Sequence, residues 1–212
     1  MRTRPTAIAT RRMLDKGSEK RGGSSTGRLT GRPNWVRSLV VHSHDPYVDL
    51  ARSSIAAQAQ GSPRPALPAD IPPELLSRQA GVFVSVKKKG KLRGCIGTYR
   101  PTEPTLAEEI IENAVRAATE DPRFPALRAD ELPEIEISVD VLSPPEGCTE
   151  GDLDPQRYGV IVESGWRRGL LLPSLPSVDT VEEQLRIAKR KAGLGPDEPC
   201  QLFRFTVERH TE

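Results

Sequence analysis

The sequence predicts an α+β fold with a largely antiparallel mixed sheet and packed helices. Three observations lead to this prediction. Segments with the alternating pattern of strands outnumber segments with helical spacing, several strands follow one another across short turns, and strict strand–helix alternation is absent. The expected order is helix, two strands, helix, three strands, helix, strand.

The first predicted helix lies in HDPYVDLARSSIAAQAQ, where Asp45 can cap it and Pro46 can occupy its first turn. A proline-rich connection follows, with one short helical turn over 74–77. The segment GVFVSVKKKGKLRGCIGT then predicts a hairpin turning at Lys89-Gly90. A two-residue turn there places Val84 opposite Cys95, and so puts Cys95 on the apolar face of the hairpin.

The rest of the chain continues the pattern. TLAEEIIENAVRAATED predicts a helix with a capping box, Thr105 with Glu108, and EIEISVDVL predicts a strand. GVIVESGWRRGLLLP predicts a hairpin at Ser164-Gly165, where Trp166 is either exposed for a ligand or partner or, as we expect, folded back at the tip. Thr180 begins the last helix, and QLFRFTVERH closes the chain as one strand.

Charge divides the chain into two parts. Residues 1–44 hold ten Lys/Arg and two Asp/Glu, although the whole chain has a net charge of only +2. This composition predicts a disordered basic N-terminal extension over 1–44 and a folded domain over 45–212. Three interpretations of the extension are open: it binds nucleic acid or an acidic partner, it is a targeting segment, or it is an addition without a function of its own. The acidic balance of the domain makes nucleic-acid binding the least favoured of the functions considered.

Other functional classes find little support. No apolar run is long enough to span a membrane, and because the Arg-rich N-terminus has no continuous apolar stretch we expect no secretory signal. The three cysteines are far apart, which disfavours a disulfide framework or zinc site and favours a reducing cytoplasm. We predict no cofactor and no metal ligand. Phosphate-binding glycine loops and zinc-protease motifs are also absent from the sequence.

The candidate functional residues lie in two segments. In KLRGCIGTYR, Arg93 is two residues before Cys95 and could stabilise its thiolate, while Gly94 and Gly97 allow close approach of backbone or ligand. The alternative is a small, half-buried structural thiol. In DPRF, Asp121 precedes a stiff turn that presents Arg123, which could bind a carboxylate or phosphate or simply pair with an acidic neighbour.

These motifs identify a family. LRGCIGT resembles the signature of the AMMECR family, and further segments match in the same order, among them DPYVDLARSSI, ELPEIEISVDVLSPPE and VDTVEEQLRIAKRKAGL. The similarity extends over about 45–212 and is greatest to the bacterial form, protein A of the AmmeMemoRadiSam system. The resemblance implies an α+β fold of two subdomains around a cleft.

What the resemblance implies about function is limited. Its expected partners are a Memo-like protein and a radical SAM protein, and its activity is unsettled. Carried onto this chain, it marks Arg93, Gly94, Cys95, Gly97 and the neighbouring Asp121 and Arg123. Cys95 is then the candidate catalytic residue and the others are candidate ligand-binding residues. The alternative is a non-catalytic module that binds a protein or a small ligand.

Overall fold

The computed structural model describes residues 45–212, and the predicted extension over 1–44 lies outside them. Two four-stranded sheets, ordered β2-β1-β3-β8 and β4-β7-β5-β6, contain antiparallel pairs throughout, which confirms the predicted α+β class. The helices are α1 (Pro46–Ala59), α2 (Pro73–Ser77), α3 (Leu106–Thr119), α4 (Val181–Lys191) and the short 3-10 helices η2 (Ala129–Glu134) and η3 (Glu150–Asp152). The strands are β1 (Val82–Lys88), β2 (Lys91–Gly97), β3 (Ile135–Leu142), β4 (Glu146–Cys148), β5 (Gly159–Ser164), β6 (Arg167–Leu171), β7 (Gln201–Phe205) and β8 (Val207–Thr211).

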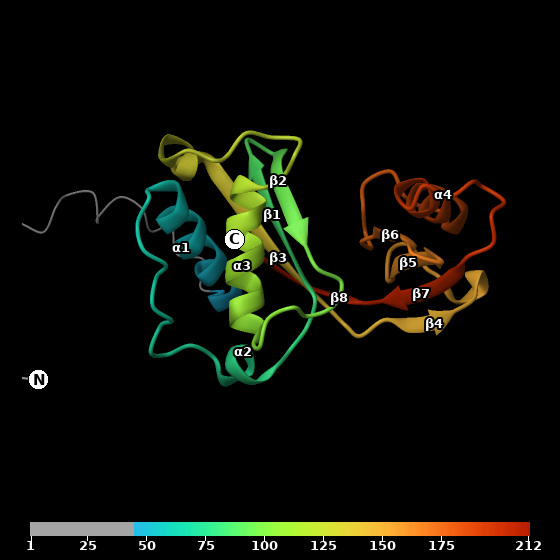
Figure 1. Ribbon diagram of the computed structural model, residues 1–212, viewed down its shortest axis with the longest axis horizontal. Coiled ribbons are helices and arrows are strands. Elements are labelled where there is room, and N and C mark those ends of the chain that lie inside the picture. Colours follow the sequence, from blue (N-terminus) through green and yellow to red (C-terminus); the bar gives the residue numbers. More distant parts are fainter. Residues whose placement is uncertain (1–44) are drawn as a thin grey trace, which may run out of the picture. The chain divides into compact units, whose positions relative to one another are not determined.

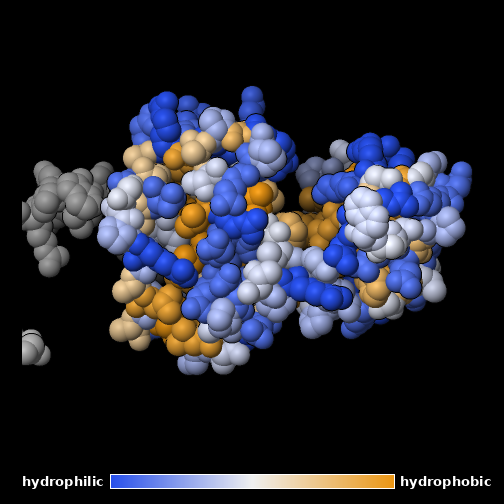
Figure 2. All heavy atoms as spheres, viewed as in Figure 1, coloured by the Kyte–Doolittle hydropathy of each residue, from blue (hydrophilic) through white to orange (hydrophobic). Residues whose placement is uncertain are grey.

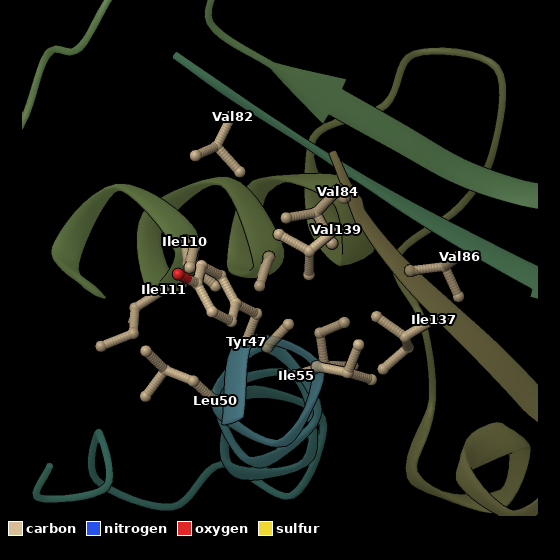
Figure 3. Close-up of a cluster of buried hydrophobic side chains, with 14 of the residues drawn as sticks. Tyr47, Leu50, Ile55, Val82, Val84, Val86, Ile110, Ile111, Ile137 and Val139 are labelled. Carbon is tan, nitrogen blue, oxygen red and sulfur yellow. The ribbon is translucent and has the colours of Figure 1, made fainter. Parts of the chain in front are cut away.

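Helices α1 and α3 cover one face of the first sheet (Figure 1). Alternate residues of β1 and β3 point into this layer, where they meet apolar side chains from both helices (Figure 3). The fully buried members include Val84, Val139, Ile55 and Ile110. The opposite face of the same sheet is therefore free of these helices.

The predicted helix starts are confirmed. The carboxylate of Asp45 accepts a hydrogen bond from the backbone N–H of Tyr47, and the hydroxyls of Thr105 and Thr180 each accept one from the residue three positions on. These bonds satisfy backbone donors that a helix start otherwise leaves without partners.

The prediction of one closing strand over 201–210 is wrong. Strand β7 pairs with β4 and β5 in the second sheet, whereas β8 pairs with β3 in the first sheet. Thr206 lies between the two strands, and the chain changes sheet there. Because QLFRFTVERH has no glycine or proline to mark a break, local sequence gave no sign of this change.

The second sheet has its own apolar cluster under α4, centred on the fully buried Val160 and Val162 of β5 and Ala188 of α4. A Cβ at Gly169 of β6 would lie 2.0 Å from the Ala188 carbonyl oxygen, so α4 packs directly on this strand. A third cluster joins the two sheets through side chains such as Phe83, Leu142, Ile161 and Phe205.

Three exposed apolar regions remain among the described residues, and one of them is Leu92 of β2, which is 41% exposed. Hydrophobic residues gather at the surface around α2 (Figure 2), where Leu76 is 45% exposed, with Leu67 exposed in the preceding connection. Trp166, at the β5–β6 turn, is 91% exposed. The expectation that Trp166 folds back onto its hairpin is therefore wrong, because the tight turn at Gly165, where φ is +61°, leaves this side chain in solvent.

Candidate functional site

The β1–β2 hairpin differs from its predicted register by one residue. Its turn is the expected Lys89-Gly90 pair, both with positive φ, but a bulge follows between Val86 and Lys87 and leaves Arg93 without a directly paired residue. Ser85 consequently lies opposite Cys95, and Val84 lies opposite Ile96. A one-residue shift exchanges the two faces of a strand. Cys95 therefore lies on the face turned away from α1 and α3, not on the apolar face.

The corrected register aligns small polar side chains across the first sheet. Cys95 pairs with Ser85, Ser85 with Ser138, and Ser138 with Thr211. Directly paired residues share a face, so these four side chains form one row on the face that the helices leave free. We call this row the thiol row; sequence reasoning missed Ser85 and Ser138, because alternation alone does not reveal which strands become neighbours.

Cys95 is half-buried and has two close polar partners. The Ser85 hydroxyl donates to its sulfur at 3.2 Å, and the backbone N–H of Cys95 donates to the Asp121 carboxylate at 2.9 Å. Burial raises the pKa of the Cys95 thiol, the Ser85 hydrogen bond and Arg123 lower it, and Asp140 and Asp121 raise it. The net direction is upward, so the thiol holds its proton at neutral pH.

Asp121 links Cys95 to Arg123. Its buried carboxylate accepts hydrogen bonds from Nε and Nη2 of Arg123 at 2.9 and 2.7 Å, as well as from the Cys95 backbone. The Arg123 hydrogen bonds hold the pKa of Asp121 well below its usual range. The Arg123 side chain remains 55% exposed, so the same guanidinium can also face a ligand.

Lys191, at the end of α4, brings a second cation to this site. Burial lowers the pKa of its amine, Cys95 raises that pKa and Arg123 lowers it. Lys191 is nevertheless an exposed residue, so its amine remains accessible to solvent and to a ligand. Its Nζ donates to the backbone carbonyl of Leu170 at 3.0 Å, and among the described residues it has no carboxylate within ion-pair distance. Sequence reasoning interpreted this lysine only as part of a favourable helix end.

Arg93 is occupied by structural contacts. Its guanidinium donates twice to Glu131, at 3.1 and 2.9 Å, and also to the backbone carbonyls of Pro125 and Ala126. Only 13% of its side chain is exposed. Arg93 thus fastens the bulge of β2 to the segment after α3, and the cation that acts on the Cys95 thiol is Arg123 rather than Arg93.

The two glycines beside Cys95 each have a packing reason. A Cβ at Gly94 would lie 2.1 Å from the carbonyl oxygen of Ala117, so α3 occupies the space of a side chain there. A Cβ at Gly97 would lie 2.3 Å from the Phe83 ring. Close approach of a ligand to these glycines stays a prediction, whereas close approach of protein is what the fold displays.

Asp140 and Arg209 adjoin the thiol row. On β3, Asp140 pairs with Phe83 of β1 on one side and with Arg209 of β8 on the other. It lies two residues after Ser138 and therefore on the same face of the sheet. Arg209 donates to its two carboxylate oxygens at 2.7 and 3.0 Å, and Asp140 is 3% exposed. This pair fixes a second carboxylate near the thiol. The negative charge of Asp140 therefore raises the pKa of Cys95.

A histidine could serve as the base for a thiol, but the histidine within the described residues lies elsewhere. His210 pairs with Val139, on the helix-covered face, where its ring stacks on Tyr47 at 3.7 Å between centroids and contacts Asp45 at 2.8 Å. It therefore lies across the sheet from Cys95 and is not its base. His42 and His44 fall outside the described residues.

Two features are absent from residues 45–212. Those residues contain no group of three or more His, Cys, Asp or Glu side chains suited to holding a metal ion. None of the helices there has the length and apolarity to cross a bilayer.

Sequence comparisons identify relatives over most of the domain. A family model described as AMMECR1 matches residues 48–210. A protein of Thermotoga maritima is 59% identical over 143 residues, 66% of this chain and 82% of that protein. Protein CA_C1420 of Clostridium acetobutylicum is 49% identical over 79% of this chain, and the match spans 36% of that longer protein.

A solved structure supports the fold. The uncharacterized protein PH0010 from Pyrococcus horikoshii superposes with a TM-score of 0.71 at 36% sequence identity. The superposition covers 77% of this chain and 88% of that chain.

Proposed function

This chain belongs to the AMMECR1 family, and from that premise we propose that it is an enzyme component that binds a small anionic molecule beside the Cys95 thiol. The observation that carries the proposal is the chain of hydrogen bonds from the Cys95 backbone through Asp121 to the half-exposed Arg123, with the Lys191 amine close enough to sense the charge of Cys95. The two cations come from segments far apart in the sequence: Arg123 lowers the pKa of the Cys95 thiol, and Cys95 in turn raises the pKa of the Lys191 amine. A carboxylate or phosphate is the ligand that two such groups favour.

The chemistry follows from the protonation states. Burial keeps the Cys95 thiol protonated, and burial also lowers the pKa of the Lys191 amine. Both shifts raise the free-energy cost of moving a proton from sulfur to amine, so the resting pair is a neutral thiol beside an ammonium group. Cys95 would act as the nucleophile once its proton has left to solvent, and the Lys191 ammonium would stabilise the thiolate.

The protein partners are part of the same proposal. The family resemblance supports a Memo-like protein and a radical SAM protein as companions, in a reducing cytoplasm. Co-purification of the full chain with each of these proteins tests this element separately from the site. If neither companion is retained, the partner assignment is wrong, whatever happens at Cys95.

One observation favours a second candidate, a non-catalytic binding module. The raised pKa of Cys95 describes a resting thiol without a charged sulfur. In a module of that kind, Cys95→Ser would keep the ligand and the companions, whereas Arg123→Gln would weaken both. In an enzyme component, Cys95→Ser would abolish the product of the assembled system.

The charge of the site can be tested without knowing the ligand. Iodoacetate and iodoacetamide alkylate thiols alike but differ in charge, so the ratio of their rates at Cys95 reports the local potential. We expect this ratio to exceed the ratio at Cys200 in the same protein. One charge about 4 Å away in water is worth about 1 kcal/mol, so Lys191→Met should lower the Cys95 ratio on the order of fivefold.

Lys189→Met is the matched control. Lys189 lies on the same helix, and its Nζ bonds to the carbonyl of Pro196, away from the thiol row. This variant should leave the ratio at Cys95 unchanged. Equal effects of the two variants, or no preference for iodoacetate in the original protein, would show that Cys95 has no dedicated anion site.

A further inference from the structure

Two cysteines far apart in the sequence meet in the second sheet. Cys148 ends β4, and Cys200 directly precedes β7. Strands β4 and β7 pair so that Cys148 lies opposite Leu202, two residues after Cys200. Residues two apart on a strand share a face, so both thiols lie on the same side of the sheet as diagonal neighbours.

Burial and packing support this placement independently of the register. Both cysteines are half-buried free thiols, and both pack against the apolar cluster under α4. They also line the same surface pocket, of about 500 Å³, together with Thr149, Gln201 and Phe203. The pair is therefore open to a small ligand from one side and backed by apolar side chains on the other.

The spacing suits a bridging atom better than a direct bond. Diagonal neighbours on paired strands have Cα atoms about 7–8 Å apart, whereas disulfides usually join Cα atoms about 4.4–6.8 Å apart. An ion placed between the sulfurs replaces one sulfur–sulfur bond by two sulfur–metal bonds and so spans the wider gap. Structural zinc would require four ligands, and the described residues offer no such group here.

We propose that Cys148 and Cys200 form a two-thiolate site for a soft monovalent cation of the Cu(I) type. Soft thiolate ligands select Cu(I) over harder ions. Each thiol releases its proton to solvent and forms one bond to the ion. One Cu⁺ and two thiols thus form a complex with a charge of −1, and two protons are released to solvent. No electron is transferred.

Nearby charges bear on this complex. Burial raises the pKa of the Cys148 thiol, Arg204 lowers it and Asp152 raises it. Arg204 lies on β7, donates to the Asp152 carbonyl at 3.1 Å and pairs with Glu146 at 3.6 Å. Its guanidinium is placed to balance the negative charge that two thiolates bring, because it already favours the ionised form of Cys148.

Transfer of copper from a coloured chelator tests the site. The reduced full-length chain is titrated without oxygen into the Cu(I)–bicinchoninate complex, whose absorbance falls as the protein takes the ion. We expect one Cu(I) per chain at this site and at least a tenfold loss of affinity in both Cys148→Ser and Cys200→Ser. Cys95→Ser is the matched control and should bind as the original protein does.

Two further measurements keep the result decisive. Circular dichroism of each variant checks that the fold persists, and native mass spectrometry should record one copper with the loss of two protons. The proposal is overturned by absence of transfer to the original protein, by retention of the ion in either Cys148→Ser or Cys200→Ser, or by equal loss in Cys95→Ser. Loss of two hydrogens without copper would also overturn it, because that mass indicates a disulfide.

Discussion

The Ser85 hydroxyl donates a hydrogen bond to the sulfur of Cys95, 3.2 Å away on the neighbouring strand. The contact exists because a bulge shifts the hairpin by one residue and places both side chains on the face that the helices leave free. A hydrogen bond to sulfur favours the thiolate over the thiol. Ser85 is therefore the positioning residue closest to the candidate nucleophile.

Ser85→Ala should slow the alkylation of Cys95 at a given pH. The Ser85 hydrogen bond lowers the pKa of a thiol that burial has already raised. Without this bond the pKa rises further, so the pH profile of the alkylation rate should move to higher pH. Mass spectrometry of the labelled peptide measures the profile.

Ser138→Ala is the control for this variant. Ser138 occupies the next position of the thiol row, but the hydrogen bond to sulfur comes from Ser85. Its substitution should leave the profile of Cys95 in place. If the pH profile of Cys95 alkylation is also unchanged in Ser85→Ala, the Ser85 hydroxyl does not affect the pKa of the thiol.

Gly94→Ala should destabilise the domain although it changes a single methyl group. The added Cβ would lie 2.1 Å from the Ala117 carbonyl oxygen, so α3 or β2 must shift. Overpacking of this kind costs about 1–3 kcal/mol. Gly147→Ala, where nothing lies within 4 Å of the added Cβ, is the matched control. Urea unfolding of both variants measures the difference, and equal midpoints would contradict the packing of α3 on Gly94.

Local sequence determined most of the fold correctly. Caps at Asp45, Thr105 and Thr180, the Lys89-Gly90 turn and the alternation over 135–142 all predicted the elements observed. These features depend on residues close together in the chain. The short strand β4 and the change of sheet at Thr206 escaped prediction because both depend on pairing between distant segments.

The candidate site was only half predictable for the same reason. The sequence singled out Cys95, Asp121 and Arg123, and the structure brings these three together. The sequence could not assign Cys95 to a face of the sheet, because no residue pattern marks the bulge beside Arg93. Lys191 is about a hundred residues away, and only the packing of α4 brings its charge to the thiol.

Glu109→Gln should destabilise the domain despite keeping size and shape. Both carboxylate oxygens of the buried Glu109 accept hydrogen bonds: one from side chains of Thr98 and Asn113, the other from the backbone N–H groups of Thr102 and Glu103. In Glu109→Gln, the amide N–H₂ group would replace one of the two accepting oxygens. It would then face the donors that this oxygen had accepted from. We expect a loss of about 1–3 kcal/mol in the free energy of unfolding.

Glu112→Gln provides the comparison for that measurement. Glu112 lies on α3 as well, but its side chain is half-buried rather than enclosed. Its substitution should change the free energy of unfolding by less than about 0.5 kcal/mol. Similar losses in the two variants would show that the hydrogen bonds of Glu109 do not hold the loop before α3.

Glu131→Gln should remove part of the acid sensitivity of the fold. The Arg93 hydrogen bonds, acting against burial, lower the pKa of Glu131 from 4.5 to about 2. A carboxylate with a depressed folded-state pKa stabilises the protein fully above its unfolded pKa, and this stabilisation is lost as the pH falls from 4.5 toward 2. At pH 7 the variant should be less stable by about 1.5–3 kcal/mol.

The same measurement at lower pH distinguishes charge from shape. The stability difference between the original protein and Glu131→Gln should shrink as the pH falls through this window, because protonation removes the charge that the substitution also removes. Glu134→Gln is the matched control, since Glu134 pairs with Lys89 at the surface and is 42% exposed. Exposed pairs contribute about 0–1 kcal/mol, so its difference should stay small at every pH. A difference for Glu131→Gln that is constant from pH 7 to 3 would mean that Arg93 is held by its two backbone carbonyls rather than by the carboxylate.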